Sequence, residues 1–468
     1  MKGDDKLDFD DLYIMNPWWR SKNEIYNDRN INSYESSKFK YYPEKLFKEI
    51  NLFEEGIYTL RGPRQIGKTT FLKLLIKKLI ENNMNPLNLF FLSCDGIKDR
   101  YELIEIIKMY VRTFNTSRKE MKYIFLDEIT VIEDWQHSIK FLVDIGLLDN
   151  SILILTGSSS YDLKSSSERL PGRKGCGKDL VYLPISFREF LKNLGISIEG
   201  KDVLEILSMS ENELKTLQFR YSFIQEYFLK YVNCGGFPKV IDEFLNNGTI
   251  SELTKKTYKD FILGDAEKYM KSRTNIIEIL KKLPDIIGQR FSWHSLKEHL
   301  SGTIESVDTI KKYFEYLGYS FILSTVFFID ISKKTIKPKK QKKVYPIDNI
   351  VNLIISDTTG RDIKMPQRIE ILTLNHILEN DDVVDNGLNL YNGPFYWYSD
   401  RGNEIDFVMD YKGELIPIEV KYQNNINKFD YIGMKKVFRK GILITKNSTF
   451  IDENIVGIPA WLFLAIKK

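Results

Sequence analysis

The stretch GPRQIGKT, at residues 62–69, matches the pattern G-x-x-x-x-G-K-[ST] in full. It follows the strand candidate GIYTL and opens the helix candidate TTFLKLLIKKLI, so its backbone N–H groups can converge on phosphate oxygens at a helix N-terminus. Lys68 would meet the β- and γ-phosphates, which also makes it a catalytic candidate, and Thr69 would ligate Mg²⁺. The residues expected to bind ATP here are Gly62, Pro63, Arg64, Gln65, Ile66, Gly67, Lys68, Thr69 and Thr70.

An acidic motif lies downstream, in KYIFLDEIT at residues 122–130. Asp127 and Glu128 close its apolar strand candidate. An Asp at this place can hold the Mg²⁺ shell, and the adjacent Glu can orient and polarise the attacking water. Because buried carboxylates need partners, two acids at the end of an apolar strand favour a functional role over packing. Glu128 is therefore the expected catalytic base, and Asp127 is an expected Mg²⁺ ligand in the nucleotide site.

Two later loops supply candidates for contacts with the γ-phosphate. The next apolar strand ends in TGSSS, where Ser158 is the expected polar sensor. The loop ERLPGRKG then offers Arg169 and Arg173, either of which could stabilise charge on the transferring phosphoryl group, in cis or from a neighbouring subunit. A solvated basic loop explains both arginines equally well. Arg173 is our catalytic candidate.

Short apolar strands alternate with amphipathic helices from residue 56 to about residue 194, which predicts an α/β fold with a parallel sheet and crossover helices. The expected strands are GIYTL, LNLFFLSC, KYIFLD and SILILTG, and the expected helices between them include FLKLLIKKLI and YELIEIIKMYV. We divide the chain into an N-terminal arm (1–50), a P-loop ATPase domain (51–200), a helical lid or linker region (201–290), a winged-helix domain (291–347) and a C-terminal α/β domain (348–468).

Composition narrows the class of protein. A chain of 468 residues suggests about three domains, and a net charge of +4 is too small for a polycation, so any nucleic-acid surface must come from local clusters. The three cysteines form no CxxC pair and the four histidines lack zinc-ligand spacing, which argues against disulfides and zinc. The acidic N-terminus lacks an apolar signal core, and no run is long enough to span a bilayer. We expect a cytoplasmic protein without a membrane partner.

A Lys-rich run, ISKKTIKPKKQKK, follows a helix-turn-helix pattern. Helices are expected from about residue 292 and over about 307–317, followed by a strand, the Lys-rich turn and a returning strand KVYPI, which is the order of a winged helix. Seven lysines from Lys333 to Lys343 would bind DNA phosphates with salt-dependent, largely sequence-independent affinity. A solubilising loop is an equal alternative. The second helix offers no Arg or Asn pair suited to base reading.

The stretch GNEIDFVMDYKGELIPIEVKY, at residues 402–422, predicts a β-hairpin. With a two-residue turn at Lys412 and Gly413, the two strands pair so that one face is wholly apolar. This register would place Ile405 opposite Val420, Phe407 opposite Ile418, Met409 opposite Ile416, Asp406 opposite Glu419 and Glu404 opposite Lys421. A slip by one residue would turn the apolar set to the wrong side, so the register has a hydrophobic rationale.

The same register brings two like charges together across the ladder, which is destabilising. A divalent cation, Mg²⁺ or Mn²⁺, between Asp406 and Glu419 would resolve this. Lys421 could then position a water or stabilise charge in a phosphodiester cleavage. The alternative is an exposed face where solvent separates the carboxylates and Lys421 neutralises them.

Five motifs occur in an order that resembles the AAA-type archaeal ATPase family of P-loop proteins: GPRQIGKTT, LDEIT followed by DWQHSIKFL, LTGSSS, LPGRKG and LPISFREFL. The likeness covers roughly residues 42–194 and implies a P-loop sheet of the additional-strand, catalytic-Glu type, with Walker A at residues 62–69 and Walker B at Asp127 and Glu128. NPWWR at residues 16–20 resembles the start of some members, and its tryptophans are expected to dock on the ATPase core.

The later GGFPKVIDEF, the winged helix and EIDFVMDYKGELIPIEVKY look like the C-terminal half often fused to these ATPases, which has a restriction-endonuclease-like, PD-(D/E)xK fold. This resemblance implies a metal site in which a helical acid joins the hairpin. Glu370 in PQRIEILTL matches that acid, so the implied metal ligands are Glu370, Asp406 and Glu419, with Lys421 as the catalytic lysine.

Two functions remain open from the sequence. The first is Mg²⁺-dependent ATP hydrolysis coupled to DNA binding and, in its stronger form, to ATP-regulated DNA cleavage. The alternative is a nucleotide-switched binding or signalling ATPase whose nuclease-like domain is inactive and docks DNA or a protein partner. The set of Asp406, Glu419 and Lys421 distinguishes them. Self-association into a homo-oligomer is compatible with both.

Overall fold

The computed structural model describes residues 7–114, 120–157, 162–163, 170, 172–270, 272–300, 302–378 and 384–468. The chain divides into two compact units, residues 1–183 and residues 184–468. Each unit is described by itself below. The finer division that the sequence suggests, into an arm and four domains, stays a prediction. Within the described residues, no helix combines the length and the apolar character needed to cross a membrane.

The first unit is built on a five-stranded sheet in which every pair of neighbouring strands is parallel. Its order is β2-β3-β4-β1-β5, so β4 is inserted between the P-loop strand β1 and the acidic strand β3. This confirms the predicted α/β, additional-strand P-loop fold. The strands are β1 Gly56–Arg61, β2 Leu89–Ser93, β3 Lys122–Asp127, β4 Ser151–Thr156 and β5 Asp179–Val181, of which only the last was not expected from the sequence.

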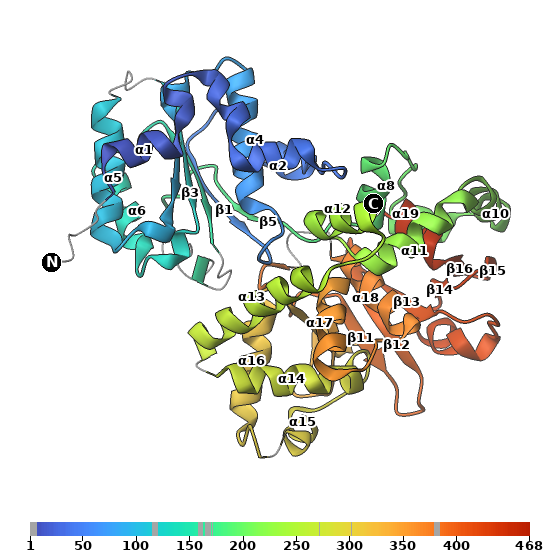
Figure 1. Cartoon of the computed structure of the whole chain (residues 1–468). Helices are drawn as coiled ribbons and strands as arrows, with labels where there is room; N and C mark the ends of the chain where they lie inside the picture. Colours follow the sequence, from blue (N-terminus) through green and yellow to red (C-terminus); the bar gives the residue numbers. More distant parts are fainter. Residues whose placement is uncertain are drawn as a thin grey trace. The chain divides into compact units, whose positions relative to one another are not determined.

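Helices lie on both sides of this sheet, with α5 and α6 on one side and α4 on the other (Figure 1). The apolar strands are buried along their length because both of their faces are covered. The helices of this unit are α1 Phe9–Met15, α2 Arg29–Ser36, α3 Glu44–Glu49, α4 Lys68–Glu81, α5 Arg100–Thr113 and α6 Trp135–Asp144.

The N-terminal NPWWR segment docks on the outer strand β2. The side chain of Asn16 accepts from the Phe91 N–H at 2.6 Å and donates to the Phe91 carbonyl at 2.8 Å, as a neighbouring strand would. The indole N–H groups of Trp18 and Trp19 both donate to the Leu89 carbonyl, at 3.0 and 2.9 Å. The segment therefore occupies backbone groups of an edge strand that is otherwise open to pairing with other chains.

The second unit begins with helices and ends with a mixed six-stranded sheet of order β11-β12-β13-β14-β16-β15. A smaller sheet, β10-β6-β9, lies in the same unit. The strands are β6 Leu323–Phe327, β7 Ile329–Asp330, β8 Thr335–Ile336, β9 Lys342–Pro346, β10 Asn389–Leu390, β11 Phe395–Tyr398, β12 Glu404–Tyr411, β13 Glu414–Lys421, β14 Gly441–Thr445, β15 Phe450–Asp452 and β16 Ile455–Pro459.

The helices of the second unit surround these sheets, and α18 packs on β12 and β13 (Figure 1). They are α8 Phe187–Asn193, α9 Val203–Ser208, α10 Glu211–Arg220, α11 Gln225–Cys234, α12 Pro238–Asn247, α13 Glu252–Met270, α14 Arg273–Ile286, α15 Trp293–His299, α16 Val307–Tyr319, α17 Asn349–Thr359, α18 Met365–Ile377 and α19 Ala460–Ile466. Helix α8, which carries the LPISFREFL motif, packs against α11 and α19 of this unit.

Two helices and a hairpin form in the predicted order around the Lys-rich run: α15, α16, β6 and β9, with β6 and β9 antiparallel. Their assignment to a winged-helix domain stays a prediction. One expectation is wrong. Lys342 and Lys343 lie on β9 and are buried, at 2% and 1% exposure, so they are not part of an exposed basic wing.

The predicted hairpin register is confirmed. Strands β12 and β13 pair with Phe407 opposite Ile418 and Met409 opposite Ile416, and Lys412 and Gly413 form the turn with φ of 53° and 82°. The alternative of a solvent-exposed acidic face is wrong. Asp406 and Glu419 are both buried, because residues from other elements cover that face as well.

Candidate functional site

The P-loop takes its shape from positive backbone angles between β1 and α4. Gly62 has φ of 149°, Gln65 of 62° and Gly67 of 109°. At Gly62 a Cβ atom would lie 2.3 Å from the carbonyl oxygen of Tyr182, so only glycine fits. Helix α4 begins at Lys68, directly after this loop. Its first backbone N–H groups have no partner within the helix and can bind an anion.

Lys68 folds back over the loop. Its ammonium group donates to the carbonyl oxygens of Gly62 and Pro63, each at 3.1 Å, and the side chain is buried. These contacts hold the charge of Lys68 close to the loop, where it can meet phosphate oxygens.

The carboxylate of Asp127 joins the P-loop helix to strand β4. It accepts from the Thr69 hydroxyl at 2.7 Å through Oδ2 and from the Thr156 hydroxyl at 2.5 Å through Oδ1. Burial raises the pKa of Asp127, and the two hydroxyl donors oppose this shift because they stabilise the ionised form. A threonine hydroxyl beside a carboxylate supplies the oxygen ligands that Mg²⁺ prefers.

Glu128 follows Asp127 in a left-handed backbone conformation, with φ of 57°. This conformation is uncommon for a residue other than glycine and turns the chain sharply away from β3. The N–H group of Glu128 donates to the Thr156 hydroxyl at 3.1 Å, which holds the turn. The structure therefore brings Thr69, Asp127 and Glu128 together as the sequence predicts.

Thr156 is a site residue that the sequence analysis missed. Its hydroxyl contacts both acidic residues, and it is wholly buried. A signal was present, because Thr156 is the polar residue that closes the apolar strand SILILT. Strands β3 and β4 are parallel neighbours with Leu126 opposite Leu155, so the next residues, Asp127 and Thr156, meet at the same edge of the sheet.

Three further candidates for contacts with the γ-phosphate are Ser158, Arg169 and Arg173. Ser158 and Arg169 lie outside the described residues. Arg173 forms a two-point ion pair with Asp144 at the end of α6, with nitrogen to oxygen distances of 2.7 and 3.2 Å. Its role in phosphoryl transfer stays a prediction.

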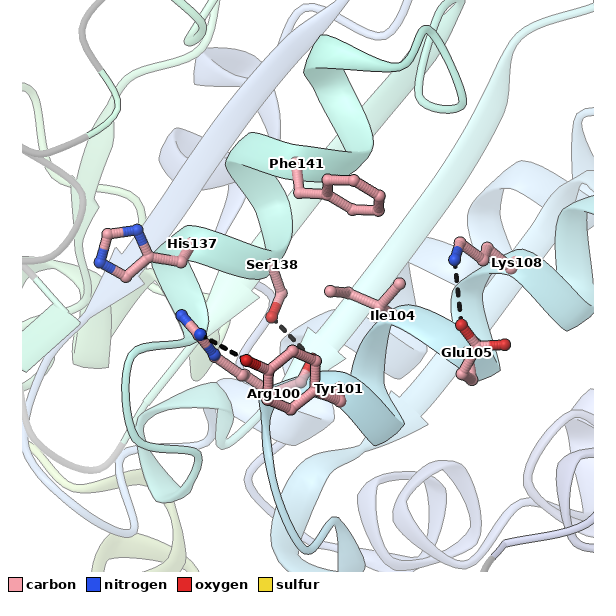
Figure 2. A pocket seen from close by; sticks show the side chains of 8 residues that line it. All are labelled: Arg100, Tyr101, Ile104, Glu105, Lys108, His137, Ser138 and Phe141. Atoms are coloured by element: carbon pink, nitrogen blue, oxygen red, sulfur yellow. Dashed lines mark hydrogen bonds and ion pairs between the residues drawn. The ribbon is translucent and has the colours of Figure 1, made fainter.

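A groove of about 300 Å³ lies between α5 and α6, apart from the P-loop (Figure 2). Its rim carries the exposed side chains of Tyr101 and Phe141. Lys108 pairs with Glu105 at 3.0 Å along one wall, and the Ser138 hydroxyl donates to the Arg100 carbonyl at 2.8 Å. None of the described residues that were predicted to bind ATP lines this groove.

In the second unit, Asp406 and Glu419 lie side by side on β12 and β13, as the register predicts. The Asp406 N–H donates to Glu419 Oε2 at 2.9 Å, and the Val420 N–H donates to Asp406 Oδ2 at 3.0 Å. Lys421 lies beside them, with its ammonium 2.5 Å from Glu419 Oε1.

Glu370 on α18 belongs to the same cluster. Its Oε2 accepts from the Tyr345 hydroxyl at 3.2 Å. Burial and the nearby Asp406 hold its pKa well above the usual range, and burial likewise raises the pKa of Glu419 to about 8. Glu370, Asp406, Glu419 and Lys421 therefore lie in one cluster.

The predicted metal arrangement is not formed. Among the described residues, no group of three or more His, Cys, Asp or Glu side chains is placed to hold a metal ion. Glu370, Asp406 and Glu419 are therefore not arranged as such a group. The ammonium group of Lys343 lies 2.8 Å from Asp406 Oδ1 instead. The physical reason is that β9 runs next to this site and directs a cation into it, which the sequence alone did not indicate.

Residues 54–191 match the model of the AAA domain. This part of the chain is therefore similar to AAA domains, and it contains the P-loop and the acidic strand β3. Residues 225–353 and 383–462 match two further models, each described as a domain of unknown function (DUF8612 and DUF4143). The second of these spans the hairpin β12–β13.

Two curated relatives match over most of the chain. An uncharacterized protein of Methanocaldococcus jannaschii is 24% identical over 81% of this chain and 78% of its own length. An uncharacterized protein of Haemophilus influenzae is 23% identical over 87% of this chain and 94% of its own length.

Solved structures match at lower similarity. The Aeropyrum pernix ORC1 protein in complex with DNA is 14% identical over 64% of this chain and 86% of that chain, with a TM-score of 0.28. Cdc6p of Pyrobaculum aerophilum is 12% identical over 71% of this chain and 99% of that chain, with a TM-score of 0.29. At such scores these structures carry no argument about the activity of this protein.

Proposed function

We propose that this protein binds and hydrolyses ATP with Mg²⁺ at the P-loop of its AAA domain, and that its second unit binds nucleic acid. The observation that carries the first part is the hydrogen-bonded chain of Thr69, Asp127 and Thr156 beside the P-loop. It supports the proposal, because a hydroxyl and an ionisable carboxylate side by side are the oxygen ligands that a Mg²⁺ bound to the phosphates would need.

The other residues of the site take complementary roles. Lys68, held at the loop by two carbonyl contacts, would exchange these for oxygens of the β- and γ-phosphates. Glu128, fixed at its backbone by Thr156, would orient and polarise the attacking water. Mg²⁺, when bound, supplies neutralisation of charge on the phosphates.

Nucleotide binding and turnover in purified variants test this proposal. Lys68→Ala is expected to lower ATP turnover by at least about 10²-fold, because it removes a charge that stabilises the transition state. Glu128→Gln is expected to bind fluorescent ATP like the wild type but to turn it over far more slowly. Lys77→Ala, on the same helix but paired with Glu35 at 2.7 Å, is the matched control. Wild-type turnover in Lys68→Ala would contradict the assignment.

Support for nucleic-acid binding comes from the segment between β7 and β9. Its exposed lysines are Lys333, Lys334, Lys339 and Lys340. Lys340 lies near the rings of Phe328 and Tyr398, each at 6.0 Å, and Arg290 stacks over the Tyr398 ring at 4.4 Å. Cations interleaved with aromatic rings suit a phosphate backbone and its bases.

The salt dependence of binding to DNA tests this second part. Replacing both Lys339 and Lys340 by Gln is expected to reduce the slope of log K against log salt by about 2, since each phosphate contact contributes about 1. The matched control replaces Lys255 and Lys256 on α13 by Gln. An unchanged slope in the first variant would leave the segment as a solubilising loop.

A further inference from the structure

The side chain of Lys343 enters the acidic site from a strand outside the hairpin. Strand β9 pairs with β6, and Lys343 points from it into the cluster, with 1% of its surface exposed. Its ammonium lies 2.8 Å from Asp406 Oδ1 and 2.5 Å from Glu404 Oε1. A lysine that is buried to this degree must be paired, and here it is paired with two carboxylates.

The oxygens of the hairpin carboxylates all have donors from the protein itself. Asp406 accepts from Lys343 and from the Val420 N–H, and Glu419 accepts from Lys421 and from the Asp406 N–H. Mg²⁺ demands near-octahedral oxygen ligands at about 2.1 Å. To bind here, it would have to displace the Lys343 ammonium from a buried position and break hydrogen bonds to backbone groups.

Cations already face the three acidic residues of the hairpin. Glu404, Asp406 and Glu419 face the cations Lys343, Lys421 and Arg290, the last of these 3.0 Å from Glu404 Oε2. The repulsion between Asp406 and Glu419 across the ladder, which suggested a metal from sequence, is therefore offset by side chains. Glu370, the fourth acid of the cluster, has a pKa that burial and the nearby Asp406 hold well above its usual range. A divalent cation would add charge where each hairpin carboxylate already faces a cation, and it would gain less than at unpaired carboxylates.

We infer that the Lys343 ammonium takes the place of a divalent cation beside Asp406 and Glu419. The cluster is a metal-independent ionic link that holds β9, and with it the base of the Lys-rich segment, to the hairpin β12–β13. It does not cleave phosphodiesters. This inference rests on residues of the second unit alone and does not depend on the ATPase proposal.

The test of this inference is the binding of Mn²⁺ to the full-length, nucleotide-free protein, measured by electron paramagnetic resonance. All variants carry Asp127→Asn, so that the P-loop carboxylate contributes no site. The protein with native Lys343 is expected to bind no Mn²⁺ at the hairpin. Lys343→Met, which keeps the length of the side chain and removes its charge, is expected to gain one Mn²⁺ site that the further change Asp406→Asn abolishes.

Two results would overturn the inference. One is a Mn²⁺ site in the protein with native Lys343 that Asp406→Asn removes, because a metal would then displace the ammonium. The other is the absence of a site in Lys343→Met, because the ammonium would then not be what excludes the metal. If Lys343→Met does not fold, Mn²⁺ binding is compared between the protein with native Lys343 and the same protein carrying Asp406→Asn. A Mn²⁺ site that only the first protein has would overturn the inference, and equal binding would support it. Plasmid nicking with Mn²⁺ that is lost in Asp406→Asn would also refute it.

Discussion

Replacing Thr156 by Val removes one hydroxyl with little change in shape. That hydroxyl donates to Asp127 and accepts from the Glu128 N–H, and Thr156 is 0% exposed, so water cannot replace it. A hydrogen bond to a charged group contributes about 1.5–3 kcal/mol, and a buried donor left without a partner costs about 1–3 kcal/mol. We therefore expect Thr156→Val to lower the free energy of unfolding of the first unit by about 3 kcal/mol.

Activity should fall as well. The left-handed turn at Glu128 loses its hydrogen bond, and a displacement of about 1 Å of a catalytic group can cost about 10²-fold in rate. The pKa of Asp127, already raised by burial, should rise further because Thr156 no longer stabilises the carboxylate. When the pH is lowered, Asp127 in the variant should therefore take up its proton at a higher pH than in the wild type. The acid limb of the pH–rate profile should move to higher pH for the same reason.

Steady-state ATP turnover as a function of pH, together with urea unfolding followed by tryptophan fluorescence, measures both effects. Thr156→Ser keeps the hydroxyl and is the matched control. It should retain most of the stability and the position of the acid limb. If Thr156→Val and Thr156→Ser both behave like the wild type, the hydroxyl does not organise the two acidic residues, and the reasoning is refuted.

Two further predictions concern stability. Trp18→Ala should lower the free energy of unfolding by about 3–5 kcal/mol, because it empties a site that is 0% exposed. It should also promote aggregation, because it removes a contact that covers the edge of β2. Phe53→Ala, at 88% exposure, is the control and should have neither effect in the same urea-unfolding and light-scattering assays. Burial raises the pKa of Asp348 to about 7, although the Gly236 and Ile350 N–H groups donate to it. The folded protein thus holds a proton that the unfolded chain releases, so its free energy of unfolding should fall as pH rises from about 4 to about 7. Asp348→Asn should reduce this fall in urea unfolding, and parallel curves would contradict the prediction.

The P-loop and the hairpin could be predicted from sequence because each is decided locally. The loop needs glycine at Gly62 and Gly67, and the hairpin needs a tight turn at Lys412 and Gly413 with apolar residues in alternation. Such constraints act between residues that are close along the chain. The sequence also predicted that the P-loop helix and Asp127 meet, and the Thr69 hydroxyl does donate to Asp127. Binding of ATP by the P-loop residues stays a prediction.

The environment of Asp406 could not be predicted, because its partner Lys343 is 63 residues away in the chain. Nothing in the run ISKKTIKPKKQKK distinguishes a lysine that points inward from one that points to solvent. Only the pairing of β9 with β6, which is decided by packing across the unit, turns Lys343 toward the hairpin. The same packing buries the acidic face that the sequence left open to solvent.

The burial of Lys342 and Lys343 also reduces the surface that can bind nucleic acid. Lys342 lies 4.7 Å from the Trp293 ring, and burial lowers its pKa to about 8, so it is poorly placed to meet a phosphate. Lys337 is partly buried near Asp330. If the exposed Lys333, Lys334, Lys339 and Lys340 each met one phosphate, the slope of log K against log salt on duplex DNA would be about −3.6. If all seven lysines of the run met a phosphate, this slope would be about −6.3. A measured slope near about −6.3 would require phosphate contacts from cations outside this segment. Arg290, which lies over the same Tyr398 ring as Lys340, would be the first of these to replace.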